Sequence, residues 1–357
     1  MASRLASTGG RRITAGMHIT LVDDSIAFDG YTASARPLGG AEKAFASLPG
    51  ALARRGHTVA VFNRCRWSMT VEGVHWDSLD GRKPLLTDVL IASRKPSLLQ
   101  FVRQAGKRVL WHTGPGRMLE RTATRNLLAE HKALVLLVSR AQAAGIGTAT
   151  APVALLPPAV RTDFLADAPC PPDTPPTAIA TTHPAHGLDW LLDLWVGRIR
   201  PLVPTAELHL HSMSLAKAAE GGAIDPALAP IAAKVAAARE HGVVAVRPQG
   251  DQLMAQAMRR ARVHLYPGHP DDVTAFTLME SQACGLPAVV RPLGAAPERI
   301  AHGLSGMVAP DDDAFANLAA LLLGDDGMRS SYSAEAHART RTWDWDAAAA
   351  ALDGVLG

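Results

Sequence analysis

Two carboxylates in the last third of the chain have the spacing of a ligand-binding pair. Asp272 and Glu280 are separated by seven residues in VHLYPGHPDDVTAFTLMESQACGLPAVV. We expect a buried strand at 263–266, a polar loop, and a short helix that opens at Glu280 and ends at Gly285. Carboxylates accept hydrogen bonds from hydroxyl groups, and free N–H groups at a helix start bind anions such as phosphate. The alternative is that the helix dipole alone favours two acids at this place.

A Gly39-Gly40 pair lies between the first expected strand and the first expected helix. Glycine lets the backbone approach a ligand closely, and the N-terminus of the helix offers unpaired N–H groups to an anion. A plain tight turn is the alternative. The turn has no G-x-G-x-x-G pattern and the chain has no G-x-x-x-x-G-K-[ST] pattern. A nicotinamide dehydrogenase and a P-loop enzyme are therefore disfavoured.

Three more polar side chains follow expected strands of the first half. His112 comes directly after RVLW at 108–111, and Arg94 and Lys95 follow DVLIA at 88–92. An imidazole can bond a hydroxyl group or position a reactant, and the two cations can pair with an acidic acceptor or a phosphate. A capping or core histidine and a solvated basic loop are the alternatives.

These side chains need a scaffold, and the chain alternates strands and helices as parallel sheets do. Strands are expected at 17–22, 57–62, 88–92, 108–111, 133–138, 153–156, 177–181, 207–211, 243–247, 263–266 and 288–290. Helices are expected between them, among them 41–55 and 188–196. Pro49-Gly50 is expected to kink or break the first of these helices. The pattern predicts an α/β fold of two doubly wound parallel-sheet domains that meet across a cleft.

A proline-rich stretch, APCPPDTPP at 168–176, separates the two alternating halves. Proline at this density continues neither helix nor sheet, so we expect an extended connector there. The chain then divides into a loose tail at 1–16, a first domain at 17–160, a second domain at 161–338 and a final segment at 339–357.

The stretch around the two acids resembles the signature of retaining GT-B glycosyltransferases of family four, the glycosyl transferases group 1. In that signature a Glu, seven residues and a second Glu are followed by an alanine-rich helix and G-x-P-V-V, here ACGLPAVV. The likeness extends over about residues 17–350, through GGAEKAFASLPGALARRGHTVAVF, VLLVSRAQAA, LPPAVRTDF, APERIAHGLSGMVAPDDD and RTWDWDAAAAALDGVLG. It implies a GT-B fold, in which two Rossmann-like domains face a central cleft and the C-terminal helix crosses back to the first domain.

The resemblance also implies a role for each candidate residue. Glu280 would hold the ribose of a nucleotide, Asp272 the transferred sugar, and His112 would lie beside that sugar. Gly39 and Gly40 would help to order the diphosphate or the acceptor. The diphosphate itself would be held by the backbone of the residues between the acids, which are Val273, Thr274, Ala275, Phe276, Thr277 and Leu278.

Two departures from the family pattern are present. The first acid is Asp272 instead of Glu, so its reach is shorter by one methylene. In AIATTHPAHGLDWLL, Thr181 and His186 stand where the family carries an Arg and a Lys for the donor diphosphate. We expect these two residues to face the donor. The donor diphosphate is then held mainly by backbone N–H groups, or by a basic side chain from another part of the chain, such as Arg247 or Arg291. A solvated loop histidine is the alternative for His186.

The composition is that of a globular protein and gives no sign of nucleic-acid or zinc binding. The chain has 357 residues, 48% of them hydrophobic and 19% charged, which is enough for sizeable cores. The formal net charge of +3 is too small to predict nucleic-acid binding. Cys65, Cys170 and Cys284 form no close pair, as is usual in a reducing compartment, and give no zinc spacing. His209 and His211 share one face of an expected strand and are expected to be structural. We expect no metal, no cofactor and no membrane span.

The expected function is transfer of a hexose-type sugar from a nucleotide-diphosphate sugar, with retention at the anomeric carbon. The acceptor would be a saccharide, a lipid-linked or another hydroxyl compound, in cell-surface polysaccharide or glycoconjugate synthesis. We expect a cytoplasmic location, compatible with peripheral contact with the inner face of the membrane. Two alternatives remain open. One is a non-catalytic GT-B protein that binds a nucleotide sugar or supports a partner transferase, and the other is a GT-B sugar-nucleotide epimerase.

Overall fold

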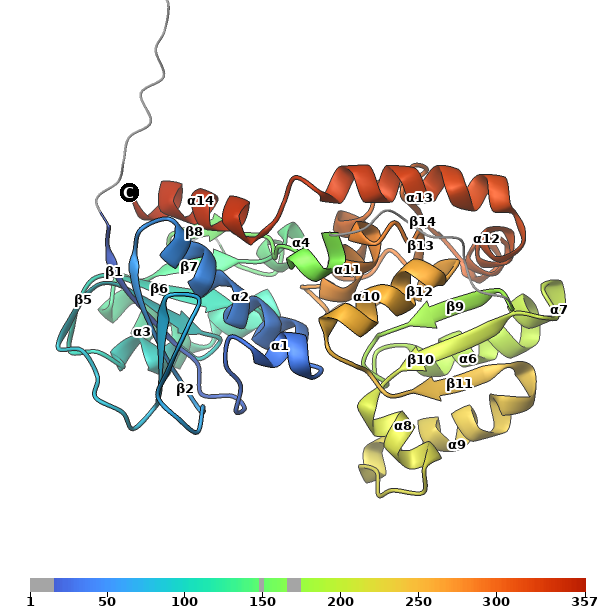
Figure 1. Cartoon of the computed structure of the whole chain (residues 1–357), viewed down its shortest axis with the longest axis horizontal. Helices are drawn as coiled ribbons and strands as arrows, with labels where there is room; N and C mark the ends of the chain where they lie inside the picture. The colour runs from blue at the N-terminus through green and yellow to red at the C-terminus, as the bar shows by residue number, and fades with distance from the viewer. Residues whose placement is uncertain (1–15, 148–150, 166–174) are drawn as a thin grey trace, which may run out of the picture.

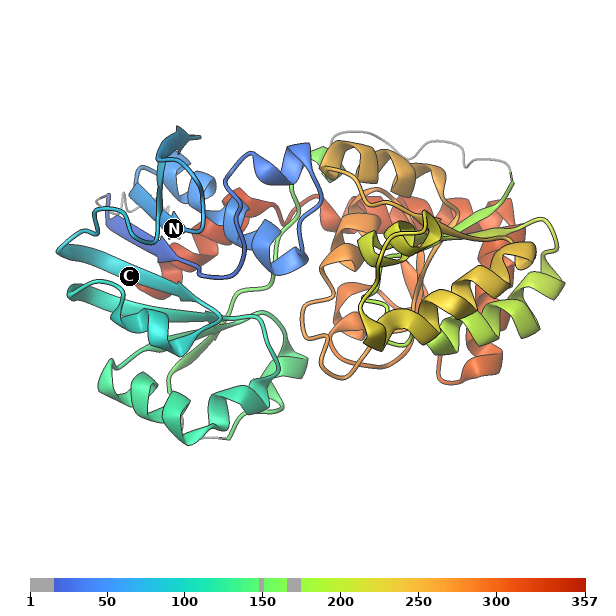
Figure 2. The same ribbon diagram turned by 90° about the horizontal axis from the view of Figure 1, so that it is seen from below.

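The chain folds into two α/β domains that lie side by side, as Figures 1 and 2 show. The computed structural model describes residues 16–147, 151–165 and 175–357. The tail at 1–15 and most of the proline-rich connector, 168–174, lie outside the described residues. No helix in the described part of the chain is both long and apolar enough to span a membrane.

The first domain is built on an eight-stranded sheet with the order β3-β4-β2-β1-β5-β6-β7-β8. All its pairings are parallel except the one between β3 and β4. Its strands are β1 (His18–Val22), β2 (Thr58–Asn63), β3 (Met69–Val71), β4 (Val74–Ser78), β5 (Leu86–Ser93), β6 (Gln104–His112), β7 (Leu134–Leu137) and β8 (Val153–Leu155). Its helices are α1 (Thr32–Ala35), α2 (Gly40–Arg54), η1 (Pro96–Gln100), η2 (Gly116–Glu120), α3 (Thr122–Glu130) and α4 (Arg140–Ala143).

The second domain has a six-stranded, fully parallel sheet with the order β11-β10-β9-β12-β13-β14. The strands are β9 (Thr177–Ala180), β10 (Glu207–His211), β11 (Val243–Val246), β12 (Val263–Tyr266), β13 (Ala288–Val290) and β14 (Gly306–Val308). The helices are α5 (Thr162–Leu165), α6 (Leu188–Leu194), η3 (Trp195–Ile199), α7 (Arg200–Leu202), α8 (Met213–Ala219), η4 (Pro226–Leu228), α9 (Ala229–Ala237), η5 (Ala238–His241), α10 (Asp251–Arg260), α11 (Phe276–Ala283), η6 (Ala296–Arg299), α12 (Asp312–Gly324) and α13 (Asp326–Thr340).

The strands form where the sequence is apolar on both faces, because helices cover both faces of a parallel sheet. β9 and β12 are buried along their whole length. The strands expected from the sequence are all present, some of them longer than expected. The doubly wound α/β fold with two sheets is therefore confirmed. β3, β4 and β14 are short strands that the sequence pattern did not predict.

The expected break at Pro49-Gly50 is absent, because α2 runs unbroken from Gly40 to Arg54. Pro49 has no N–H group, so the helix loses one hydrogen bond to the carbonyl of Phe45. Both Pro49 and Gly50 are buried, and the buried face of α2 extends from Ala44 to Leu52. Packing of this face stabilises the helix by more than the missing hydrogen bond costs.

The expectation that a helix opens at Glu280 is wrong by one turn. α11 begins at Phe276, which places Glu280 in its second turn. The Asp272 carboxylate accepts hydrogen bonds from the N–H groups of Thr274 and Ala275. Ala275 adopts a left-handed conformation with φ of 45°, and the helix starts directly after it. This start has neither a glycine nor a helix-capping side chain, so the sequence did not mark it.

The last helix, α14 (Trp345–Leu356), leaves the second domain and packs on α2 of the first domain (Figure 1). Trp345 and Leu352 join the core of the first domain, and Asp353 lies 3.0 Å from the ring of His57. The chain crosses between the domains at two neighbouring places. Near these crossings, the indole N–H of Trp343 donates to the carbonyl of Pro158 at 3.1 Å.

The two domains also touch where α2 meets α11. A Cβ atom on Gly40 would lie only 2.4 Å from Cδ2 and 2.7 Å from Cβ of Phe276. Contacts below 3.0 Å force something to move, and here the obstacle includes the Cβ atom of the neighbour. Only glycine fits at position 40 with the domains in this arrangement.

Gly40→Ala should therefore push α11 away from α2 and destabilise the protein. Overpacking of this kind costs about 1–3 kcal/mol, and each kcal/mol lowers a midpoint by about 2–4 °C in domains of 150–250 residues. Scanning calorimetry measures the effect. Gly354→Ala is the matched control, because a methyl group there meets nothing within 4 Å. Equal midpoints for Gly40→Ala and the unmodified protein would contradict the close approach.

Candidate functional site

Two helix N-termini from different domains meet at the boundary between the domains. α2 begins at Gly40 and α11 begins at Phe276, and these two residues are in contact. Neither helix has a side-chain hydrogen bond at its N-cap, which is Gly39 in α2 and Ala275 in α11. The first N–H groups of both helices have no acceptor among the described residues. Their positive dipole ends therefore converge on one place, which suits an anion.

A buried cluster of charges lies one turn further along both helices. The Lys43 ammonium of α2 donates to Glu280 of α11 at 2.6 Å and lies 2.7 Å from a carboxylate oxygen of Asp251, the first residue of α10. The other oxygen of Asp251 lies 2.8 Å from Nε of Arg161, an ion pair without aligned hydrogen-bond geometry. Lys43 of the first domain and Arg161 at the start of the second thus face the two anions Glu280 and Asp251 of the second domain.

Burial and the neighbouring charges shift the pKa values of both Glu280 and Lys43. Burial raises the pKa of Glu280 above its usual value, although the Lys43 charge opposes the shift. Burial alone would lower the pKa of Lys43, but the charges of Glu280 and Asp251 raise it above 10.5. Lys43 is therefore cationic at neutral pH. One oxygen of Glu280 is engaged by Lys43, and the other has no hydrogen bond with a described residue.

Asp272 supports its own loop in this structure. One oxygen accepts from the N–H of Ala275 at 2.9 Å and from the hydroxyl of Thr274 at 3.2 Å. The other accepts from the phenol of Tyr266, whose pKa burial and the Asp272 charge hold well above 10. The carboxylate thus lies at the α11 N-terminus, with hydrogen bonds to both of its oxygens.

The backbone from Val273 to Leu278 forms the turn into α11. The side chains of Val273 and Phe276 pack with the core of the first domain. The hydroxyl of Thr181, at the end of β9, donates to the hydroxyl of Thr277 at 2.7 Å. It also lies 3.0 Å from the ring of His264, whose pKa is lowered to about 3 by complete burial. Thr181 is therefore beside α11, and its role toward the donor stays a prediction.

His186 lies beside the same loop. Its ring stacks on His269, which precedes Asp272 by three residues, with centroids 4.3 Å apart and planes inclined by 12°. Burial, followed by the neighbouring His269 and His183, lowers the pKa of His186 below its usual value. The structure thus brings Thr181, His186 and the residues from Asp272 to Glu280 into one group.

His112 is buried at the end of β6. Its Nε2 lies 3.2 Å from the carbonyl oxygen of Pro115, and its Nδ1 has no partner among the described residues. Burial lowers its pKa, so the ring is neutral near pH 7. A neutral imidazole with one unsatisfied nitrogen can still bond a hydroxyl group.

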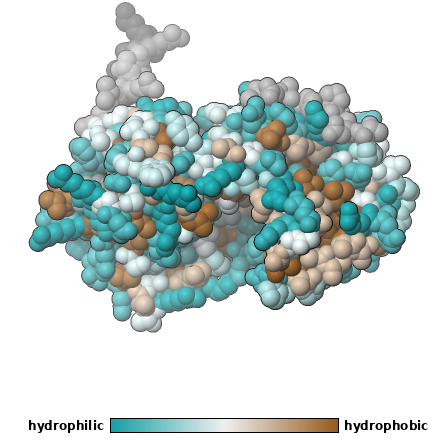
Figure 3. Space-filling model, turned by 60° about the horizontal axis from the view of Figure 1, so that its bottom comes forward, coloured by the Kyte–Doolittle hydropathy of each residue, from teal (hydrophilic) through white to brown (hydrophobic). Residues whose placement is uncertain are grey.

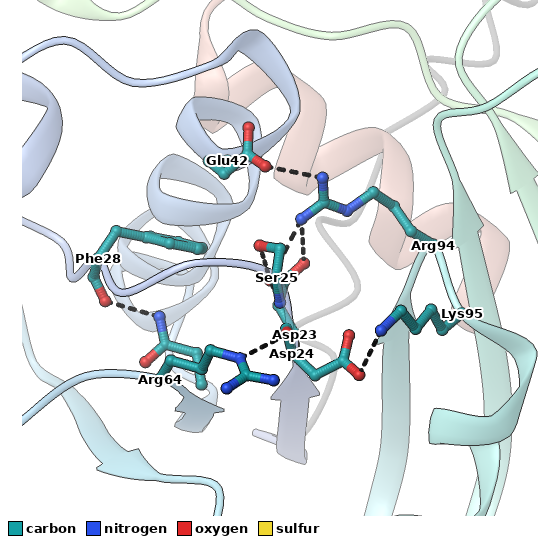
Figure 4. A network of polar contacts seen from close by, with 9 residues as sticks. Asp23, Asp24, Ser25, Phe28, Glu42, Arg64, Arg94 and Lys95 are labelled. Carbon is teal, nitrogen blue, oxygen red and sulfur yellow. Dashed lines mark hydrogen bonds and ion pairs between the residues drawn. The ribbon is translucent and has the colours of Figure 1, made fainter. Parts of the chain in front are cut away.

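Arg94 and Lys95 follow β5 and bind acids of the first domain, as Figure 4 shows. Arg94 donates to Asp23 at 2.9 Å and to Glu42 at 2.7 Å, and Lys95 donates to Asp24 at 2.7 Å. Asp23 is buried, and Arg94 is partly so. The two cations are therefore engaged in the first domain, and their role toward an acceptor stays a prediction.

The two arginines suggested as substitute bases have other contacts. Arg247 directly follows the edge strand β11 and donates to Glu220 at 2.5 Å. Arg291 lies over the ring of Trp190, 4.5 Å from its centroid. The structure does not bring either residue into the group around α11.

The two strand histidines have separate surroundings. His209 lies 2.8 Å from Glu207, whereas His211 is buried, which lowers its pKa to about 4. In the described part of the chain no three or more His, Cys, Asp or Glu side chains gather as a metal site would require.

Sequence reasoning missed the residues that join the domains here. Lys43 and Asp251 form the charge cluster. Arg299 donates to the carbonyls of Thr274 in its own domain, at 3.0 Å, and of Val138 in the first domain, at 2.7 Å. Burial lowers the pKa of Arg299. The partners are far apart in sequence, so local spacing carried no signal for them.

The surface is hollowed between the two lobes, as the space-filling view in Figure 3 shows. A ligand entering between the domains would meet residues of both of them. Arg117 of the first domain and Asp271 of the second form an exposed ion pair at this boundary, with one N–O distance of 2.7 Å.

A family model matches most of the second domain. Residues 177–325 match the family model described as Glycosyl transferases group 1, which confirms the resemblance to group 1 for that part of the chain. An exopolysaccharide phosphotransferase of Streptomyces coelicolor is 32% identical over 89 residues. That match covers 24% of this chain and only 9% of the length of the relative.

Solved structures share the fold over nearly the whole chain. Sucrose-phosphate synthase from Thermosynechococcus elongatus matches with a TM-score of 0.69 at 14% identity, over 95% of this chain and 98% of the other. Anabaena HepE in complex with UDP-glucose matches with a TM-score of 0.67 at 14% identity, over 95% and 99%. WaaG, a glycosyltransferase involved in lipopolysaccharide biosynthesis, gives 0.64 at 14% identity, over 95% and 99%. The GT-B fold is therefore confirmed.

Lys43→Met should destabilise the protein in a pH-dependent way. Removing one partner of a buried ion pair costs about 3–5 kcal/mol, because it leaves a buried charge uncompensated. The raised pKa of Lys43 means that its stabilising effect is complete below 10.5 and is lost as pH rises above that value. In the variant, protonation of Glu280, whose pKa burial already raises, relieves the excess negative charge at acid pH. Urea unfolding should show the largest difference from the unmodified protein between about pH 7 and 9.

The difference should shrink both toward pH 5 and above pH 10.5. Lys217→Met, on the exposed side of α8, is the control and should change stability little at any pH. A stability difference for Lys43→Met that does not vary with pH would argue against the charge cluster.

Proposed function

We propose that this chain is a retaining, metal-independent glycosyltransferase that moves a hexose-type sugar from a nucleotide-diphosphate sugar to a hydroxyl acceptor. The family match of the second domain and the GT-B fold support the class of reaction. The structure of HepE holds UDP-glucose, and another holds UDP and glucose, which supports a nucleotide-sugar donor for this chain too.

The observation that carries the proposal is the meeting of two uncapped helix N-termini beside Glu280. A diphosphate bound there would accept hydrogen bonds from the free N–H groups of α11 and from those of α2 at Gly40. The hydroxyl groups of a ribose next to it would donate hydrogen bonds to Glu280. The second carboxylate oxygen of Glu280 has no hydrogen bond with a described residue. The arrangement thus matches a nucleoside diphosphate in both charge and hydrogen bonding.

The proposed reaction is front-face attack. The acceptor oxygen forms a bond to the anomeric carbon on the side from which the diphosphate leaves, and the bond between that carbon and the phosphate oxygen breaks. The departing phosphate takes the hydroxyl proton, so no protein base is required. The protein contributes position and charge stabilisation through the helix N-termini. No metal and no cofactor takes part in this scheme.

Asp272 and His112 complete the donor side of the proposal. Asp272 would accept a hydrogen bond from a sugar hydroxyl at the N-terminus of α11 while it keeps its bond to the N–H of Ala275. His112 would bond the sugar or the acceptor through its unpartnered Nδ1. Arg94 and Lys95 would face the acceptor from the first domain. The acceptor is proposed to be a saccharide or lipid-linked compound of cell-surface polysaccharide or glycoconjugate synthesis, on the cytoplasmic side of the membrane.

Incubation with a panel of nucleotide sugars and sugar acceptors tests the function. We expect release of nucleoside diphosphate, a product that retains the donor's anomeric configuration by NMR, and unchanged activity after treatment with EDTA. Interconversion of nucleotide sugars without an acceptor would indicate an epimerase instead. Binding without turnover, together with a co-purifying transferase, would indicate a non-catalytic partner protein.

Glu280→Gln should abolish thermal stabilisation by nucleoside diphosphates. At a ligand concentration of 100 times Kd, a ligand stabilises a protein by about 2.7 kcal/mol, and the variant should lose most of this gain. Asp251→Asn is the matched control, because it disturbs the same Lys43 cluster without removing the proposed ribose ligand. We expect the control to keep its ligand-induced shift despite a lower starting midpoint. Loss of the shift in both variants would attribute the effect to the cluster and not to the ribose contact.

A further inference from the structure

Three histidines from two loops gather at the carboxyl edge of the second sheet. His183 and His186 lie between β9 and α6, and His269 lies between β12 and α11. The rings of His183 and His186 have centroids 5.2 Å apart, and those of His186 and His269 are stacked at 4.3 Å. β9 and β12 are neighbours in the sheet, so both loops leave from the same edge. The proposed reaction gives no role to His183 or His269.

Hydrogen bonds from the loop backbone show which ring nitrogen of His183 and His269 carries the proton. Nδ1 of His269 accepts from the N–H of Asp271 at 3.1 Å, and Nδ1 of His183 accepts from the N–H of Ala185 at 3.2 Å. A nitrogen that accepts a hydrogen bond carries no proton, so both neutral rings carry theirs on Nε2. Nε2 of each ring is therefore a donor. A second proton on either ring would break its bond to the backbone.

His186 differs from its two neighbours. Neither of its ring nitrogens has a hydrogen bond with a described residue. It can therefore take a second proton without the loss of an existing bond. Burial and the two neighbouring imidazoles lower its pKa, and Asp272 and Asp271 oppose this shift. Without a ligand the ring is thus neutral near pH 7.

The charged groups that face the stack come from three elements. Asp271 and Asp272 belong to the loop before α11, and Asp271 is held by Arg117 of η2. The N-terminus of α11 adds the positive end of its dipole. Each helix end is equivalent to about half a positive charge, so the two meeting N-termini supply about one in total. The diphosphate of a nucleotide sugar carries two negative charges, which leaves about one charge to be balanced.

We propose that the histidine stack is a proton-coupled diphosphate site, in which His186 takes up a proton from solvent when the diphosphate of a nucleotide sugar binds. His183 and His269 keep their backbone bonds at Nδ1 and donate hydrogen bonds from Nε2. This inference rests on the proposed function and names the groups that neutralise the donor. It makes donor affinity rise as the pH falls, because binding favours the imidazolium form.

Isothermal titration of the full chain with UDP-glucose, or with the nucleotide sugar of the panel that stabilises it most, tests the inference. The diphosphate of a nucleotide sugar is a diester without an ionisation near neutral pH, so proton uptake measured in two buffers of different ionisation enthalpy comes from the protein. We expect uptake of up to about one proton, and an affinity that weakens by up to about tenfold per unit as the pH rises between 6 and 8.

His186→Gln keeps a hydrogen-bond donor but cannot titrate. It should abolish the proton uptake and flatten the pH profile, and its affinity at pH 6 should fall toward that at pH 8. His269→Gln should weaken binding at every pH and keep the uptake, because His186 remains. His241→Gln, on a partly exposed residue of η5, is the control and should match the unmodified protein. Thermal unfolding of each variant without ligand shows that it is folded.

The outcomes separate the two proposals. Binding of the nucleotide sugar without proton uptake and with a flat pH profile would overturn the role of the histidines and leave the proposed function intact. Proton uptake that persists in His186→Gln would overturn it too. Absence of nucleotide-sugar binding at every pH, with the protein folded, would overturn the proposed function and this inference together.

Discussion

The close contact between Gly40 and Phe276 is the constraint on which the rest of the site depends. Because position 40 has no Cβ, the first turn of α2 can lie directly against the first turn of α11. One turn further along each helix are Lys43 and Glu280, which therefore reach each other at 2.6 Å. The same approach aligns two positive helix ends and forms the buried ion pair. A larger residue at position 40 would move the two helix ends apart and would also separate Lys43 from Glu280.

The ion pair also controls the chemistry available to Glu280. Burial favours the neutral acid, which would donate one hydrogen bond of its own and accept fewer. The ammonium of Lys43 opposes that shift and holds one oxygen in place. An ionised carboxylate with its second oxygen free is the form that accepts bonds from two hydroxyl groups. Lys43 thus favours the ionised form of Glu280, the form that the proposed ribose contact requires, although the two residues belong to different domains.

The sequence predicted the two alternating domains because apolar runs and glycine stops are local properties. The position of Asp272 and Glu280 beside one helix also followed from local spacing. The start of α11 did not, because it depends on bonds from Asp272 to two backbone N–H groups and on a left-handed Ala275. The partner of Lys43 is 237 residues away. Only the packing of the two domains brings such residues together, and no pattern in one sequence contains that packing.

Around α11, charged side chains join the domains through hydrogen bonds to backbone groups as well as through ion pairs. Arg299 donates to the carbonyl of Thr274, in the turn before α11, and to that of Val138 in the first domain. Glu298 beside it accepts from the N–H groups of Arg140 and Ala141 at the start of α4. A shift of the first domain would therefore pull on the Thr274 carbonyl through one rigid guanidinium. The N–H groups proposed to hold the diphosphate follow directly after Thr274, so the shape of the donor site depends on how the two domains are docked.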